Sequence, residues 1–255
     1  MSISVRRSRR RSVKFVRLCT AEALVINRIN IIVGTLCWLA QPLVVFECKA
    51  AGDFVARVTD TQGVSTANAV VSLHALNFTP PPAADAPRAF MDQRNRRFDP
   101  HVLPVWTGTL VNFPNSDEIH HSVYSFSAPK RFKLPLYKDM PAEPLMFDQS
   151  GVVTLGCNIH DWMLGYIYVT DTPYFGITDA QGTTRVDALP AGRYEVRLWH
   201  SHGETRTSQV SETVQVNDAA EVERNYRLEL RAASQDMQPA PSTNSVEDKF
   251  GRWSN

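Results

Sequence analysis

Seven residues, Cys157–Met163, place a thiol, an imidazole and a thioether at spacings of three and three. An apolar run, Val152–Gly156, precedes this stretch, and another apolar run begins at Met163. Both runs have the length and composition of β-strands. A loop between two neighbouring strands can present Cys157, His160 and Met163 to one point in space. The stretch therefore predicts a metal site at one end of a β-sheet.

The adjacent residues His120 and His121, about 36 positions before Cys157, offer one more imidazole. Two imidazole nitrogens, one thiolate and a weak axial sulfur form the ligand set of a mononuclear blue copper site. Zinc is the alternative metal, but structural zinc sites usually carry several thiolates or histidines in paired spacing. Consecutive strand residues face opposite sides of a sheet, so one histidine of the pair binds and the other faces solvent.

Residues 88–172, about a third of the chain, resemble the cupredoxin family. The matching motifs are Phe98-x-Pro-x-x-Leu-x-Val, Gly108-Thr-x-Val-x-Phe-x-Asn-x-Asp, His121-Ser-Val and Cys157-x2-His-x2-Met. The last motif matches the short ligand loop of amicyanin. The wider context is similar to bacterial proteins of the methylamine utilisation and plastocyanin-like types.

This resemblance implies a Greek-key β-sandwich with one type 1 copper ion. The ligands that it implies are His121, Cys157, His160 and Met163. Asn115 and Asp117, placed in the family frame, select His121 over His120. The resemblance also implies that electrons pass through an exposed edge of His160, where a partner docks on an apolar patch.

The implied function is that of a periplasmic one-electron carrier and not of an enzyme. Its partner would be a c-type cytochrome or a periplasmic dehydrogenase. The alternative is a non-shuttling copper-binding or structural subunit of a cell-envelope complex, because free carriers are usually one small domain. A multicopper oxidase needs several His-x-His pairs, and this chain has one, His200 and His202. A CuA site needs two cysteines in one loop, and the loop here has one. No Ser-His-Asp order or phosphate-binding loop indicates catalysis.

The loop departs from amicyanin and plastocyanin at Ile159, where those proteins have proline before the histidine. Proline has no backbone N–H, whereas Ile159 has one. The Cys157 sulfur can therefore accept a hydrogen bond from Ile159 as well as from Ser122. Such bonds withdraw charge from the metal and predict a higher reduction potential than that of an equal site with proline.

The first 50 residues predict an export signal that is removed. Seven basic residues between Arg6 and Arg17 are followed by an apolar run, Ile29–Phe46, and by small residues suited to cleavage after Ala50. The apolar run also has about the 17–25 residues of a spanning helix, so an uncleaved anchor is the alternative. Without a retained anchor, the mature protein would be periplasmic and would have no membrane partner.

Cleavage changes the charge and the cysteine count. Nine of the 27 basic and two of the 26 acidic residues lie in residues 1–50, which leaves 18 against 24 and a net charge of −6. A weakly acidic exported protein is a poor candidate for binding nucleic acid. Cys157 then stands alone, so no intrachain disulfide can form, and bound copper would protect the thiol from oxidation.

The segments on either side of the copper module predict a second sandwich. Residues 51–77 and 173–231 alternate in polarity and contain Asp-x-Gln-Gly turns, which predicts a small antiparallel sandwich. Their motifs resemble the transthyretin-like, carboxypeptidase-regulatory family. This resemblance implies a sandwich of the Ig-like or transthyretin-like type. We therefore expect a cupredoxin domain, 88–172, inserted into this sandwich after a proline-rich linker, 78–87. The alternative is a single extended sheet system without a separate second core. Residues 232–255 predict a disordered tail.

Overall fold

A computed structural model describes residues 51–82, 85–139, 141, 143–203 and 210–231. Within these ranges every regular element is a β-strand, which confirms the prediction of an all-β chain. No helix in the described part is long and apolar enough to cross a membrane. The predicted signal, 1–50, and the predicted tail, 232–255, lie outside the described residues.

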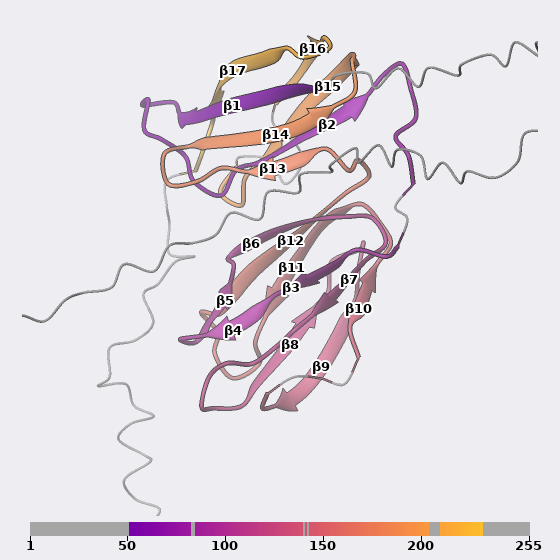
Figure 1. Cartoon of the computed structure of the whole chain (residues 1–255). Coiled ribbons are helices and arrows are strands. Elements are labelled where there is room, and N and C mark those ends of the chain that lie inside the picture. The colour runs from indigo at the N-terminus through magenta and orange to yellow at the C-terminus, as the bar shows by residue number, and fades with distance from the viewer. Residues whose placement is uncertain (1–50, 83–84, 140, 142, 204–209, 232–255) are drawn as a thin grey trace, which may run out of the picture. The chain divides into compact units, whose positions relative to one another are not determined.

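One β-sandwich draws its strands from both ends of the described chain. They are β1 (Gly52–Asp60), β2 (Val70–Ala75), β13 (Phe175–Ile177), β14 (Thr183–Leu189), β15 (Gly192–Trp199), β16 (Val210–Val216) and β17 (Glu221–Leu228). One sheet has the order β14-β1-β17 and the other the order β13-β2-β15-β16 (Figure 1). We call this unit the split sandwich.

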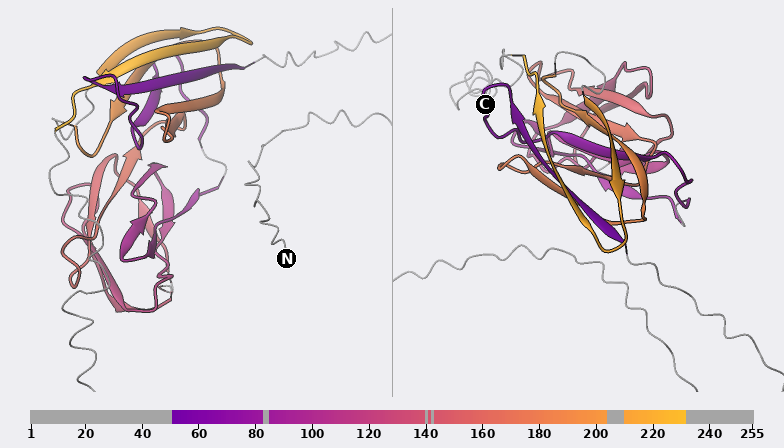
Figure 2. Two further views of the ribbon diagram at one scale, coloured as in Figure 1. Left: turned by 90° about the vertical axis from the view of Figure 1, so that its left-hand side faces the viewer. Right: turned by 90° about the horizontal axis from the view of Figure 1, so that it is seen from above.

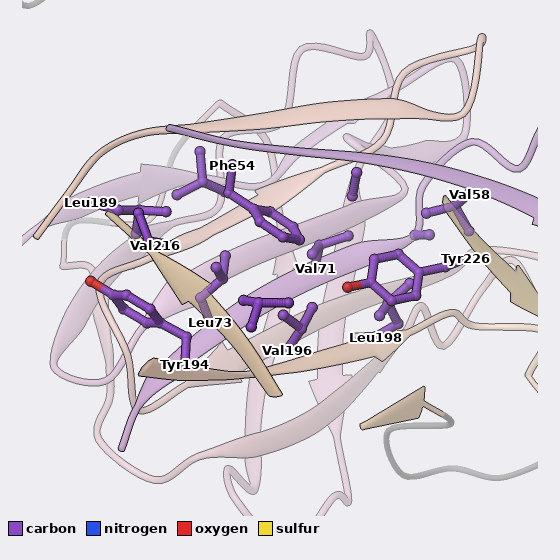
Figure 3. Packing of buried hydrophobic residues seen from close by; sticks show 14 of the residues in the cluster. Phe54, Val58, Val71, Leu73, Leu189, Tyr194, Val196, Leu198, Val216 and Tyr226 are labelled. Carbon is purple, nitrogen blue, oxygen red and sulfur yellow. The ribbon is translucent and has the colours of Figure 1, made fainter. Parts of the chain in front are cut away.

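The two sheets of the split sandwich enclose one apolar core. Alternate residues of β15 point inward, and Tyr194, Val196 and Leu198 are fully buried. They share a cluster with Phe54 of β1 and Tyr226 of β17 (Figure 3). Each fully buried side chain of this kind contributes roughly 1.5–3 kcal/mol. The core therefore joins strands that are far apart in the sequence.

The pairing of β1 with β17 differs from the predicted antiparallel arrangement. These strands run parallel over eight residue pairs, from Asp53↔Glu221 to Asp60↔Leu228. Figure 2 shows β17, in yellow, beside β1, in indigo. The remaining pairs of the split sandwich are antiparallel. Parallel strands need a long crossover, and the chain between β1 and β17 supplies it.

Residues between β2 and β13 form a second sandwich. Its strands are β3 (Arg88–Phe90), β6 (Val102–Trp106), β7 (Thr109–Asn112), β8 (His121–Ser125), β9 (Phe132–Tyr137), β10 (Leu145–Phe147), β11 (Gly151–Gly156) and β12 (Leu164–Thr170). A sheet of order β6-β12-β11-β8-β9 faces a sheet of order β10-β7-β3 across one buried cluster. We call this unit the central sandwich.

A short hairpin completes the central sandwich. It consists of β4 (Asp92–Arg94) and β5 (Arg97–Asp99), joined by a two-residue turn. Both turn residues, Asn95 and Arg96, have positive φ angles, 54° and 56°. Two positive φ angles are the conformation of a type I′ turn, whose twist matches that of a hairpin.

Candidate metal centre

The loop Cys157–Met163 joins two strands that are paired to each other. β11 ends at Gly156 and β12 begins at Leu164, and these two residues face each other in the ladder. Inside the loop, the Met163 backbone N–H donates to the His160 carbonyl at 2.9 Å, which closes a turn. The sheet therefore fixes both ends of the loop that carries the candidate ligands.

His121 comes from the neighbouring strand and is the first residue of β8. β8 pairs with β11 through Gly156↔Tyr124, directly before Cys157. The Ser122 hydroxyl accepts a hydrogen bond from the Asn158 backbone N–H at 2.9 Å, which ties β8 to the loop. Sheet pairing therefore brings two segments, 36 positions apart in sequence, to one end of the sheet.

Three of the predicted ligand atoms meet in a buried cluster. The ligand atoms of His121, Cys157 and His160 all lie within 4.8 Å of one another. The Cys157 Sγ is 3.9 Å from His121 Nδ1 and 3.7 Å from His160 Nδ1, and the two Nδ1 atoms are 3.1 Å apart. All three residues are buried: Cys157 is 2% exposed, His121 is 0% exposed and His160 is 3% exposed.

The surroundings of Cys157 favour its thiolate. Burial works to raise the pKa of Cys157, but the His121 ring, the Ser122 and Ile159 backbone N–H groups and the His160 ring outweigh burial. Together they lower this pKa to about 6. The thiolate is the form of cysteine that binds metals. The N–H of Ile159, which was expected to reach the sulfur, contributes to this lowering.

His121 is held from its outer side by Asp117. The His121 Nε2 lies 2.8 Å from Asp117 Oδ2. Burial works to lower the pKa of His121, but Cys157 and Asp117 together raise it. Burial likewise works to raise the pKa of Asp117, and hydrogen bonds from Arg96, His121 and Asn95 lower it overall. Asp117 therefore stays ionised at neutral pH.

The other two residues considered in the sequence have different environments. Met163 is 2% exposed and belongs to the same buried cluster as Cys157. His120 is exposed, whereas its neighbour His121 is buried. Of the two histidines, the structure places His121 beside the cysteine, as expected. Simple strand alternation is not the reason, because β8 begins at His121 and its next residue, Ser122, also contacts Cys157.

His160 differs from the expectation of an exposed edge. It is 3% exposed, and the Trp162 ring lies against it with centroids 5.1 Å apart. Ile159, the preceding residue, is 45% exposed instead. The loop thus turns an aliphatic side chain to solvent and keeps the imidazole inside.

The donor set fits copper. Two imidazole nitrogens and one thiolate that face one another are the strong ligands of a type 1 site, and a nearby thioether suits its weak axial position. The site offers three strong ligands, one thiolate and two imidazoles, whereas structural zinc sites usually have four. Bound copper would supply one-electron chemistry at this position. His121, Cys157 and His160 would hold the ion.

A hydrogen-bonded Ser72–His74–Asp171 array was not predicted from the sequence. The Ser72 Oγ lies 3.0 Å from His74 Nε2, and His74 Nδ1 lies 2.9 Å from Asp171 Oδ1. Ser72 is 0% exposed, however, so its hydroxyl cannot reach a substrate. Residues i and i+2 of a strand share a face, which is the only sequence signal for the Ser72–His74 contact.

His200 and His202 form a structural pair. Their rings lie 5.5 Å apart, and the His202 backbone N–H donates to His200 Nδ1 at 3.1 Å. The His200 Nε2 is 3.1 Å from the Ala67 carbonyl oxygen, to which it donates. Both ring nitrogens of His200 are therefore engaged within the split sandwich.

Comparisons with known proteins give structural similarity and no sequence match. No protein-family model matches the chain, and no curated protein matches it significantly. The copper-containing nitrite reductase of Thermus scotoductus SA-01 is similar at 22% identity and TM-score 0.32, over 39% of this chain and 26% of that one. The chain thus spans about a quarter of that enzyme.

Two smaller proteins are similar over nearly their whole length. The purple cupredoxin of Nitrosopumilus maritimus has 24% identity and TM-score 0.29, over 34% of this chain and 100% of its own. A mutant of amicyanin in its reduced form has 23% identity and TM-score 0.30, over 40% of this chain and 99% of its own. With identities below 25% and TM-scores near 0.3, these similarities do not indicate the function of the chain.

Proposed function

We propose that the chain is a periplasmic electron carrier with one type 1 copper ion, bound by His121, Cys157, His160 and Met163. One observation carries the proposal: three buried donor atoms from two paired segments of one sheet lie within 4.8 Å of one another. A cage fixed by strands needs little rearrangement between oxidation states, and such preorganisation is what a functional metal site requires.

The electrostatics support the same proposal. A cysteine with a pKa lowered to about 6 is a thiolate at neutral pH and is ready to bind a metal ion. In the proposed layout, residues 1–50 are a cleaved export signal, and a cupredoxin domain, 88–172, is inserted into a transthyretin-like sandwich. The proposed partner is a c-type cytochrome or a periplasmic dehydrogenase.

Copper loading followed by visible absorption tests the proposal. We expect an intense band at about 600 nm from sulfur-to-copper charge transfer. The Cys157→Ser variant should lose this band, and the His120→Ala variant, changed at an exposed neighbour of His121, should keep it. Reversible reduction and electron exchange with cytochrome c should follow. A copper-loaded protein without the band would refute the type 1 site.

A second candidate is a copper-binding subunit that does not shuttle electrons. Two observations favour it: His160 is 3% exposed, and the split sandwich has its own core. Slow or absent exchange with cytochrome c in a protein that shows the visible band would support this candidate. Rapid exchange would support the carrier.

A further inference from the structure

Asp117 connects the candidate ligand His121 to the hairpin β4–β5. Its Oδ1 accepts the Asn95 backbone N–H at 2.6 Å, and its Oδ2 accepts the Arg96 backbone N–H at 2.8 Å. The same Oδ2 lies 2.8 Å from His121 Nε2. One carboxylate therefore has three partners.

The hairpin holds Asp117 in place independently of His121. The two donating amides belong to the positive-φ turn residues, which direct both N–H groups to the carboxylate. The hairpin is itself fixed to the segment that carries Asp117, because Asp92 Oδ2 accepts the Ser116 hydroxyl at 2.8 Å. The carboxylate is thus positioned before any metal binds.

The contact also decides which nitrogen of His121 is free. An ionised carboxylate can only accept hydrogen bonds, so Nε2 carries the proton and donates it. Nδ1 is then the nitrogen that can bind a metal ion, because it is the ring atom that lies near Cys157 and His160. A hydrogen bond from the outer nitrogen of a metal-binding histidine fixes its tautomer and increases its basicity.

We propose that Asp117 is a positioning residue that sets the His121 tautomer and biases the copper site toward Cu(II). This inference rests on the proposed copper function. A negative charge on the outer nitrogen makes the imidazole a stronger donor, which favours the higher charge on the ion. The carboxylate is only 13% exposed and His121 is 0% exposed, so solvent screens their interaction weakly.

Substitution of Asp117 by asparagine tests the redox part. Asn keeps the shape and one acceptor oxygen, which can still serve His121 and Arg96, but it removes the charge and the acceptor for the Asn95 N–H. Outer-shell changes typically cost 10–100-fold in metal affinity, and we expect Cu(II) affinity to fall about tenfold more than Cu(I) affinity in Asp117→Asn. A potentiometric titration would record this change as a rise of about 59 mV for a one-electron couple.

Asp92→Asn is the matched control, because Asp92 anchors the same hairpin without touching His121. It should leave the ratio of Cu(I) to Cu(II) affinities unchanged. Equal shifts in Asp117→Asn and Asp92→Asn would mean that loosening the hairpin, and not the charge, is responsible. No shift in Asp117→Asn would equally overturn the proposal.

Nitrogen NMR of labelled histidine in the metal-free protein tests the tautomer part separately. We expect His121 to carry its proton on Nε2 in the wild type and to lose this preference in Asp117→Ala. An Nε2 without a proton in the wild type would overturn the inference even if copper binds. A copper-loaded wild-type protein without the visible band would instead refute the proposed function. The protonation of His121 in the metal-free protein would still show whether Asp117 positions this ring.

Discussion

At the residue scale, two polar groups act on the proposed copper ligands in opposite directions. The Ile159 N–H stabilises negative charge on Cys157 and so favours the reduced ion, as its lowering of the cysteine pKa indicates. The Asp117 carboxylate increases the basicity of His121 and favours the oxidised ion. In the proposed copper site, these two groups would therefore shift the reduction potential in opposite directions.

Replacing Ile159 by proline removes one side of this balance. If the lost hydrogen bond differs by about 1 kcal/mol between the oxidation states, the potential should fall by roughly 40 mV. Voltammetry of the copper-loaded Ile159→Pro variant measures this. Ile159→Val, which keeps the N–H, should stay at the wild-type value. A potential that is unchanged or higher in the proline variant contradicts the role given to this amide.

The sequence predicted the candidate ligands because each lies in a short motif next to a strand. It did not predict the contact between Asp117 and His121, although the two residues are only four positions apart. Asp117 was used there only to align the family motif. That contact depends on the hairpin that fixes the carboxylate, and a positive-φ turn made of Asn95 and Arg96 lacks the usual glycine signal.

At the element scale, apolar runs and alternation of polarity predicted several strands and failed for others. β11, β12 and β15 follow clear apolar patterns. β9 contains Pro135, which argues against a strand in a sequence-based prediction. β9 lies at the edge of its sheet, next to β8 alone, where proline is tolerated. β14 was missed because only three of its seven residues are buried.

Strand β12 is packed closely enough that one added methyl group should destabilise the central sandwich. A Cβ on Gly165 would lie 2.7 Å from the Cβ of Phe98, a buried residue of β5. Overpacking of this kind costs about 1–3 kcal/mol. Chemical denaturation of Gly165→Ala should show this loss, and Thr154→Val, on an exposed position of β11, should stay within about 0.5 kcal/mol of the wild type. Wild-type stability in Gly165→Ala would mean that the strands separate easily.

At the scale of the whole molecule, the parallel pair β1–β17 closes the split sandwich. Its partners, Asp53–Asp60 and Glu221–Leu228, are separated by most of the chain. Local sequence patterns cannot specify such a partner, because the pattern of each strand indicates only that one of its faces is buried. The sequence therefore predicted the strands approximately and an antiparallel sandwich, but it did not predict the parallel pair β1–β17. The domain boundaries, the export signal and the tail stay predictions.

The half-buried histidine His200 should make the folded protein sensitive to acid. Burial, with smaller effects of His202 and His101, lowers the pKa of His200 to about 4, although its bond to the Ala67 carbonyl opposes this. In the unfolded chain a histidine takes up its proton at about pH 6.5. Between these two values only the unfolded state binds the proton, so the free energy of unfolding falls as the pH is lowered from about 6.5 to 4.

Full protonation of the unfolded state alone would cost about 1–3 kcal/mol at 1.36 kcal/mol per pKa unit, after allowance for partial exposure. Denaturant unfolding at several pH values between 7 and 4.5 measures this loss. His200→Gln keeps an N–H for Ala67 and should be less stable at pH 7 but lose less on acidification, whereas His120→Gln, changed at an exposed site, should follow the wild-type curve. If His200→Gln has the same pH dependence as the wild type, the acid sensitivity arises elsewhere, and the burial of His200 does not hold it neutral.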